Sequence, residues 1–141
     1  MTIVTQYNNY ACVAACLESI KKDFGDSDFS HKEFVQDNLD LFSGGLDTEG
    51  ACDFFKIREI ATRAGLEAGE CKNGTLTNSD SEAAILFVYW GDDEGNKHCV
   101  RLHSSDDKTT KVMNPMNPNH LDEIPISWIK GGFKIKKPNK A

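Results

Sequence analysis

The sequence predicts one domain of the α+β class, in which helices come first and antiparallel strands follow. The chain has 141 residues, which is enough for one hydrophobic core and too few for two domains of ordinary size. Up to Gly65, apolar side chains recur at the spacing of amphipathic helices. Beyond Gly65, short runs of β-branched and aromatic residues alternate with polar turns, which is typical of strands. We therefore expect residues 1–141 to fold around one core.

Three helices are predicted in the first half of the chain. The first covers residues 11–24, where apolar side chains follow the helical period, and Gly25 suits its C-terminal end. The second begins at a capping-box pattern, Ser30 followed by Glu33, and is expected to end near Gly44–Gly45. The third is expected between residues 54 and 65 and closes at its glycine. The apolar stripe of the second helix is Phe34, Val35, Leu39 and Phe42.

Four strands are predicted in the second half. Residues 84–90 read AILFVYW, a buried strand, and the turn-rich GDDEGN follows it. Residues 97–103 and 109–114 form the next two strands, joined by a turn at Ser105–Asp107. Residues 133–137 are expected to be a late or edge strand.

Composition excludes several classes of protein. The net charge of −6 argues against a dedicated binder of the nucleic-acid backbone. No apolar run approaches the ~20 residues that cross a bilayer, and no signal peptide is visible at the N-terminus. A soluble, cytoplasmic protein is therefore expected, unless a dedicated secretion apparatus delivers it as an effector. Five of the sixteen basic residues lie between Lys130 and Lys140, and this basic tail, about 134–141, is interpreted as a solvated, charge-protected edge strand and chain end.

The cysteines are expected to be reduced thiols. There are five, at positions 12, 16, 52, 71 and 99, which is an odd number in a chain without a secretion signal. None of the spacings gives C-x-x-C, and the histidines do not stand at zinc-finger spacing. No metal and no cofactor are therefore predicted.

Cys12 is the first candidate for chemistry. It lies in the first turn of the first predicted helix, where unpaired N–H groups and the helix dipole stabilise an anion. A thiol in such a place ionises more easily, and the thiolate is the nucleophile. The alternative is a small core residue, the commoner role of a cysteine near a helix start.

His98 and Asn114 form the second part of the candidate site. Alternation along residues 97–103 puts His98 with Val100 and Leu102 on the face expected to pack on the helices. If the turn at Ser105–Asp107 makes a hairpin, His98 and Asn114 become cross-strand neighbours. The Asn114 oxygen would then accept the imidazole N–H and direct the other ring nitrogen toward the thiol.

Gln6 is the fourth candidate. It precedes the cysteine by six residues, and its amide N–H₂ is placed to stabilise the oxyanion together with the backbone N–H of Cys12. The alternative is a solvated glutamine near the N-terminus. Other polar residues have plainer interpretations: Cys16 as a core thiol, Cys99 and His103 as structural or surface residues on the opposite strand face, and His31 and His120 as exposed.

At these residues the chain resembles papain-like cysteine peptidases of the C39 group, which includes peptidases that remove double-glycine leader peptides. QYNNYACVAACL at 6–17 is similar to the Gln-x₅-Cys opening of that group. KHCVRL at 97–102 is similar to its histidine strand, and the step from His98 to Asn114-Pro115 resembles its His to Asp-Pro spacing. ISWIKGGFKI at 126–135 resembles its closing segment.

The resemblance implies a papain-like fold, with N-terminal helices carrying the nucleophile packed on a C-terminal antiparallel sheet. It implies Cys12 as nucleophile, His98 as general base and acid, Asn114 as the orienting residue and Gln6 as oxyanion donor. Two positions depart from the pattern. Val13 stands where the group often has glycine, and Asn114 where it usually has aspartate, so the imidazole receives no negative charge from its partner.

Three functions follow as hypotheses. The first is a cysteine peptidase that acts on a protein or peptide. The second is a glutamine deamidase or transglutaminase, an effector or toxin that uses the same triad, because fold alone does not choose the acceptor. The third is an inactive module that keeps the cleft to bind a peptide, which Val13 and Asn114 leave open. The substrate and the oligomeric state do not follow from the sequence.

Overall fold

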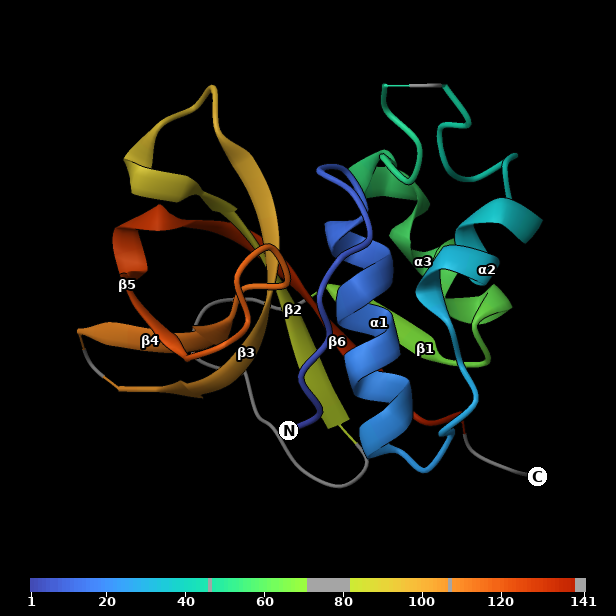
Figure 1. The fold of residues 1–141 in the computed structure, drawn as a ribbon. Coiled ribbons are helices and arrows are strands. Elements are labelled where there is room, and N and C mark those ends of the chain that lie inside the picture. The colour runs from blue at the N-terminus through green and yellow to red at the C-terminus, as the bar shows by residue number, and fades with distance from the viewer. Residues whose placement is uncertain (46, 71–81, 107, 139–141) are drawn as a thin grey trace.

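A computed structural model describes residues 1–45, 47–70, 82–106 and 108–138 of the chain. Helices lie on one side of an antiparallel sheet, and the far half of that sheet curls away from them (Figure 1). The helical elements of the described residues are α1 (Cys12–Asp23), α2 (His31–Asp37) and α3 (Ile57–Arg63), with short 3₁₀ turns η1 (Phe54–Lys56), η2 (Trp90–Asp92) and η3 (Ile126–Trp128).

The first and third helices agree with the expectation from periodicity. Helix α1 packs its apolar side against the sheet, and its buried residues run from Val13 to Ile20. Helix α3 is extended at its start by the 3₁₀ turn η1. Gly65 follows the helix with φ of +79°, a conformation that glycine adopts without strain. None of the helices in the described ranges is long and apolar enough to span a membrane.

The second helix is shorter than predicted. Ser30 caps the first turn of α2, as the capping pattern indicated. The helix ends at Asp37, however, with Asn38 as its C-terminal cap, and not near residues 44–45. Asn38 leaves the helical conformation, and its side-chain amide donates to the Phe34 carbonyl at 2.8 Å. This local hydrogen bond competes with continuation of the helix, so the apolar stripe extends into a turn.

The sheet has strand order β1-β6-β2-β3-β4-β5, and every neighbouring pair is antiparallel. The strands are β1 (Glu67–Glu70), β2 (Glu82–Tyr89), β3 (Lys97–Ser105), β4 (Thr109–Met113), β5 (Asp122–Pro125) and β6 (Ile129–Lys136). Strands β1 and β5, which are the two edges, have no counterpart in the sequence prediction.

The last strand is not the edge strand that its lysines suggested. Strand β6 lies between β1 and β2, so it is paired on both sides. Phe133 and Ile135 on this strand are buried, whereas Lys134 and Lys136 reach the carboxylate of Glu82 at 3.7 and 3.4 Å. Part of the predicted solvated end is therefore a central strand, because its apolar residues alternate with lysines that have acidic partners.

The two faces of the sheet belong to two apolar clusters, and this corrects the face assigned to His98. Cys99 and Arg101 point toward α1: Cys99 packs in the helix-side cluster, and Arg101 donates to Ser19 and Asp23 of that helix. Val100 and Leu102 instead belong to a second cluster on the opposite, curled face. Alternation identified the two sets correctly, but the helices cover the other set.

Candidate active site

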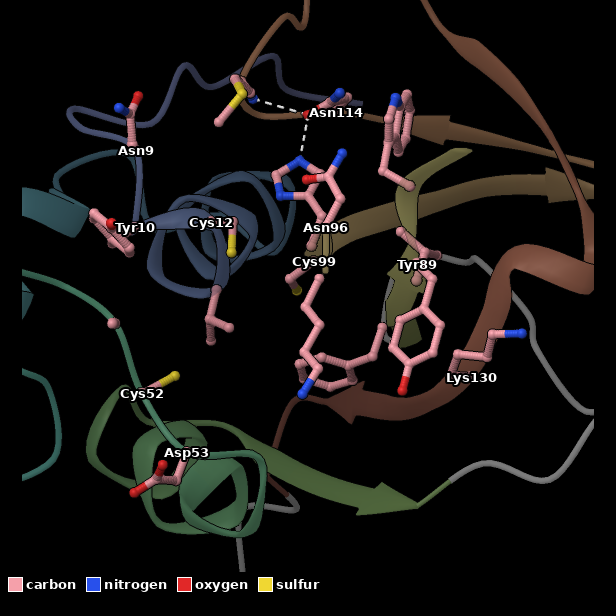
Figure 2. A pocket seen from close by; sticks show the side chains of 18 residues that line it. Asn9, Tyr10, Cys12, Cys52, Asp53, Tyr89, Asn96, Cys99, Asn114 and Lys130 are labelled. Atoms are coloured by element: carbon pink, nitrogen blue, oxygen red, sulfur yellow. Dashed lines mark hydrogen bonds between the residues drawn. The ribbon is translucent and has the colours of Figure 1, made fainter. Parts of the chain in front are cut away.

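An open cleft of about 980 Å³ lies where the N-terminal end of α1 meets the ends of β2 and β3 (Figure 2). Cys12, His98 and Asn114 all line this cleft. Its opposite wall is the loop segment 51–53, which includes Cys52. The structure thus brings together three of the four residues that the sequence singled out, from a helix, a strand and the loop after a strand.

Cys12 is the first residue of α1 and is half-buried. The residue before it, Ala11, is the helix cap and provides no side-chain hydrogen bond, so the first-turn N–H groups are not capped by it. Gly50 packs against Ala11 with φ of +95°, and a Cβ built there would come within 3.1 Å of the Ala11 side chain. A glycine at this position allows the 51–53 wall to lie close to the thiol.

The pKa of Cys12 lies well below the usual range of a thiol. The side-chain interaction with Cys99 contributes most, and contacts with His98 add to it. Burial opposes the shift but is outweighed. In the same pair, burial and the neighbouring thiols hold the pKa of Cys99 well above its usual range, so Cys99 keeps its proton as a donor. Cys12 is therefore the thiol that ionises.

Asn114 determines which nitrogen of His98 faces the thiol. The backbone N–H of Met116 donates to Asn114 Oδ1 at 3.0 Å, so the amide must present its oxygen here and not its nitrogen. His98 Nε2 lies 2.6 Å from the same oxygen, and it must carry a hydrogen to bond to it. The dashed lines in Figure 2 mark these two hydrogen bonds to Asn114. The remaining nitrogen, Nδ1, is thus the one available to Cys12.

The predicted strand register is wrong by two residues. In the β3–β4 ladder Leu102 pairs with Val112 and Arg101 with Met113, and a bulge follows Leu102. Asn114 is the residue after the Arg101–Met113 pair, so this register extended by one residue sets it opposite Val100 and makes it a diagonal neighbour of His98. A shift of two residues keeps every side chain on its face, so the side chains still meet.

Burial and the contacts of His98 shift the pKa of its imidazole in opposite directions. Burial disfavours the imidazolium, but contacts with Cys12 and Asn114 outweigh it and raise the pKa of His98. Trp90 stands edge-on to the imidazole, with ring centroids 5.9 Å apart, and packs on Trp128. Together with the lowered pKa of Cys12, this arrangement favours a thiolate–imidazolium pair.

Gln6 occupies a different position from the other three. It is buried, but it is not among the residues that line the cleft. Its Nε2 donates to the Asn8 carbonyl at 2.7 Å, which uses one of its two amide hydrogens, and its Oε1 has no partner among the described residues. Its backbone N–H donates to the Pro115 carbonyl at 2.8 Å. Gln6 is thus tied to the residue after Asn114.

Sequence reasoning missed several residues of the cleft. Cys99 was assigned to the face away from the site, yet it contacts Cys12. Cys52 was not singled out, and burial together with the nearby Cys12 charge raises its pKa to about 12. Trp90 was only part of an aromatic run. The alternation of β3 placed Cys99 opposite His98, and only the position of α1 shows that this face meets Cys12.

The burial of the other cysteines and histidines agrees with the prediction in part. Cys16 is a buried core thiol, and His103 and His120 are exposed. His31, predicted to be solvated, is buried, because Glu18 and Tyr7 enclose its ring. Cys71 lies outside the described residues. In the described part of the chain no three metal-ligating side chains gather in a way that would hold an ion.

The comparison with solved structures concerns C39 peptidase domains. The peptidase domain of Streptococcus ComA, a bifunctional ABC transporter involved in a quorum-sensing pathway, is similar with a TM-score of 0.70 at 17% identity, over 96% of this chain and 98% of its own. A putative C39-like peptidase from Bacillus anthracis matches with a TM-score of 0.69 at 12% identity, over 99% and 96%. A double-glycine motif protease from an AMS/PCAT transporter, solved with a leader peptide, matches at 0.65 and 16%, over 97% and 91%.

These likenesses confirm the predicted α+β, papain-like fold, which is the fold of C39 peptidase domains. Comparison of the sequence with models of protein families and with curated proteins finds no match.

Proposed function

We propose that this protein is a cysteine hydrolase that cleaves an amide bond, most simply a peptidase acting on a protein or peptide. The observation that carries the proposal is the hydrogen-bonded order Met116 N–H, Asn114 Oδ1, His98 Nε2 beside the lowered pKa of Cys12. A buried core thiol would need neither an oriented imidazole nor an open cleft. The C39 peptidase domains of the same fold support this choice of chemistry.

The reaction follows from these positions. The Cys12 thiolate attacks the carbonyl carbon of the substrate, and the carbonyl oxygen becomes negative. The backbone N–H of Cys12 and the amide of Gln6 are the donors proposed for that oxyanion. His98, charged after taking the thiol proton, gives a proton to the leaving amine as the C–N bond breaks and a thioester forms.

Hydrolysis of the thioester completes the cycle. His98, now neutral, removes a proton from water, and the hydroxide attacks the thioester carbon. The C–S bond breaks, the acid product leaves and the thiolate–imidazolium pair returns. Asn114 keeps the ring in the same tautomer through both steps because its oxygen is held by Met116. No oxidant, metal or cofactor enters these steps.

The test compares the wild type with Cys12→Ala and Cys16→Ala. Each protein is incubated with a bacterial lysate and with a host-cell lysate, and the products are read by mass spectrometry. New peptide termini made by the wild type and by Cys16→Ala, but not by Cys12→Ala, support a peptidase. Cys16 is the matched control because it is a buried thiol one turn away on the same helix.

The other outcomes contradict the peptidase assignment in different ways. Glutamines that gain about one dalton without new termini would indicate a deamidase, and a glutamine-linked amine would indicate a transglutaminase. Lysate proteins retained by wild type and Cys12→Ala alike, without any product, would indicate a binding module. Thermal unfolding of both variants checks that the fold is intact.

A further inference from the structure

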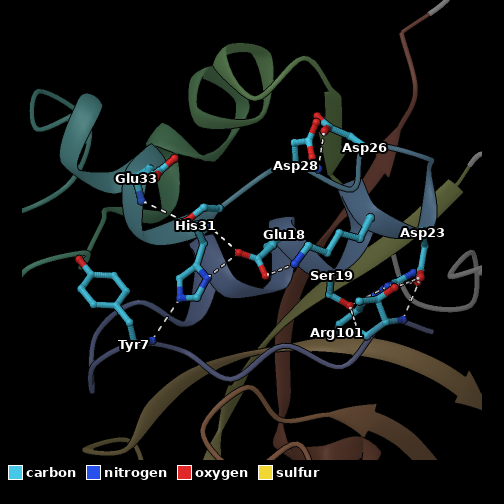
Figure 3. A network of polar contacts seen from close by, with 12 residues as sticks. Tyr7, Glu18, Ser19, Asp23, Asp26, Asp28, His31, Glu33 and Arg101 are labelled. Carbon is cyan, nitrogen blue, oxygen red and sulfur yellow. Dashed lines mark hydrogen bonds and ion pairs between the residues drawn. The ribbon is translucent and has the colours of Figure 1, made fainter.

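A buried histidine outside the cleft holds the segment that leads into Cys12. His31, the first residue of α2, is 6% exposed, and Glu18 beside it is 8% exposed (Figure 3). Glu18 Oε1 lies 3.1 Å from His31 Nδ1 and accepts the backbone N–H of His31 at 2.8 Å. On the other side of the ring, the backbone N–H of Tyr7 donates to His31 Nε2 at 3.1 Å. The mechanism above uses none of these groups.

These contacts determine the state of the His31 ring. Because Nε2 accepts a hydrogen bond from a backbone N–H, it must have a free lone pair, so the ring hydrogen is on Nδ1. That hydrogen is directed at Glu18. Burial opposes ionisation of Glu18, but hydrogen bonds from His31 and Lys22 outweigh it and lower the pKa of the carboxyl, so Glu18 is the matching acceptor.

The segment held by His31 is the one that carries the proposed oxyanion donors. Gln6 is bonded through its own N–H to Pro115, and the next N–H, of Tyr7, is bonded to His31. Tyr7 and Asn8 are further tied to Glu49, at 2.6 Å each. Residues 9–10, which follow, line the cleft and lead directly to the N–H of Cys12. Hydrogen bonds hold residues 6–8 at these points, and the covalent backbone of residues 9–11 connects them to Cys12.

We propose that His31 is a positioning residue: its Nε2 fixes the Tyr7 backbone and thereby places Gln6 and the Cys12 N–H around the oxyanion. This rests on the proposed function, because an oxyanion forms only if Cys12 attacks a carbonyl. The proposal assigns the formation of the thiolate and the stabilisation of the oxyanion to different residues. The thiolate depends on His98, Asn114 and Cys99, whereas stabilisation of the oxyanion depends on His31.

Two conservative variants divide the contacts of His31 between them. In His31→Asn the amide reaches the position of Nδ1, so the contact with Glu18 is kept and the acceptor for Tyr7 is lost. In His31→Gln the amide reaches the position of Nε2, so its oxygen accepts the Tyr7 N–H; the side-chain contact with Glu18 is lost, and the backbone N–H of residue 31 still donates to Glu18. His120→Asn, at an exposed loop histidine, is the matched control.

Two reagents read the two properties of the site without knowledge of the substrate. Iodoacetamide alkylates the thiolate by displacing iodide, and no oxyanion forms. With 4-nitrophenyl acetate the thiolate attacks the ester carbonyl, an oxyanion forms, nitrophenolate leaves and water later hydrolyses the thioester. Rates at Cys12 are measured by mass spectrometry of the labelled peptide and by nitrophenolate release, with Cys12→Ala as background.

We expect His31→Asn to lose acylation of Cys12 while its alkylation is retained. In His31→Asn, acylation by 4-nitrophenyl acetate falls at least about tenfold, toward the roughly hundredfold cost of misplacing a group by about 1 Å, while alkylation stays within about twofold. His31→Gln and His120→Asn keep both rates. Gln6→Ala loses acylation too, and the double variant Gln6→Ala/His31→Asn loses less than the product of the two single losses.

Three results would overturn the proposal. One is acylation of His31→Asn at the wild-type rate. Another is an equal loss in His31→Gln and His31→Asn, or a parallel loss of alkylation, because either would mean that His31 only maintains the fold. If His31→Asn does not fold by circular dichroism, His31→Gln still decides, since a tenfold loss of its acylation contradicts the role of Nε2. A wild type whose Cys12 reacts with neither reagent above background would instead overturn the proposed function itself.

Discussion

Asn114 Oδ1 lies 2.6 Å from His98 Nε2, although the two residues are not opposite each other in the β3–β4 ladder. The pair forms diagonally, beyond the last residue of β4, where the chain turns and Met116 N–H meets the same oxygen. One acceptor therefore serves a backbone group and the imidazole at once. The backbone group gives the oxygen its direction, and the oxygen gives the ring its tautomer.

Replacing Asn114 tests this relationship. Asn114→Ala removes the acceptor, so the imidazole loses its orientation, and we expect turnover to fall by up to about 100-fold. Asn114→Asp keeps the acceptor and adds a negative charge, which favours the imidazolium. The already raised pKa of His98 should then rise further, so the alkaline limb of activity moves to higher pH. Steady-state rates across pH measure both effects, and an unchanged alkaline limb in Asn114→Asp would contradict the contact.

The lowered pKa of Cys12 predicts the pH dependence of its alkylation. An ordinary thiol loses its proton at about pH 8.5, so its reaction with iodoacetamide slows as the pH falls below that value. Cys12 should stay reactive well below it and slow only as the pH falls through its own, lower pKa. Because the interaction with Cys99 contributes most to the shift, Cys99→Ala should move this limb to higher pH.

Cys16→Ala is the control for that experiment. Cys16 is also a buried thiol, and it lies near the Cys99 carbonyl but is not among the causes of the Cys12 shift. Its removal should leave the alkylation profile of Cys12 unchanged. Equal shifts in both variants would show that loss of packing, and not the thiol of Cys99, controls the charge of Cys12.

Trp90 is expected to protect the imidazole from water. Its ring stands edge-on to His98 and packs on Trp128, with ring centroids 5.4 Å apart in the tryptophan pair. Trp90→Ala opens the His98–Asn114 hydrogen bond to competing water, so turnover should fall by about tenfold, and the free energy of unfolding should fall by about 3 kcal/mol. Trp128→Phe keeps a ring beside Trp90 and should retain activity. Kinetics together with urea unfolding separate the two effects.

Breaking the buried ion pair between Arg101 and Asp23 should lower the free energy of unfolding at neutral pH. Arg101 is 2% exposed and also donates to Ser19 at 2.8 Å. Arg101→Met leaves Asp23 charged without this partner, which should cost about 3 kcal/mol, the lower end for a broken buried pair because Asp23 is partly hydrated. Lys111→Met, at an exposed pair, should cost no more than about 0.5 kcal/mol.

The pH dependence of that loss has a definite sign. Burial opposes ionisation of Asp23, but hydrogen bonds from Thr2 and Arg101 outweigh it and lower the pKa of the carboxyl. Its contribution to stability is therefore present above the unfolded pKa and is lost as the pH falls through the folded pKa. The difference between wild type and Arg101→Met should be full at pH 7 and shrink in acid. Urea unfolding at several pH values measures it, and a difference that grows in acid would contradict the ion pair.

Local patterns in the sequence predicted the elements that make the site. The apolar period of residues 11–24 predicts α1, and it puts Cys12 in the first turn, as found. Alternation along 97–103 predicts β3 and separates His98 from Cys99. Both inferences depend only on neighbours within a few residues, which are the interactions that helix and strand periods report. The catalytic roles of these residues stay predictions.

Contacts between distant segments were beyond such patterns. A period of two tells which side chains share a face, but not which face the helices cover. The sequence prediction therefore put the face of His98 under the helices, whereas the structure has the face of Cys99 there. The lysines of β6 indicated an edge strand because the pairing with Glu82 was not visible. His31 seemed solvated because Glu18 and Tyr7 approach it only in the folded chain.

The sequence by itself determined that helices precede an antiparallel sheet, that one cysteine lies in the first turn of a helix, and that a histidine near the start of one strand and an asparagine at the end of the next lie close together. Only the tertiary structure decided that Cys99 meets Cys12, that the strands pair two residues from the predicted register, and that His31 holds the Tyr7 backbone. The physical reason is that periodicity arises from the geometry of one element, whereas register, covered face and buried polar partners arise from how several elements pack.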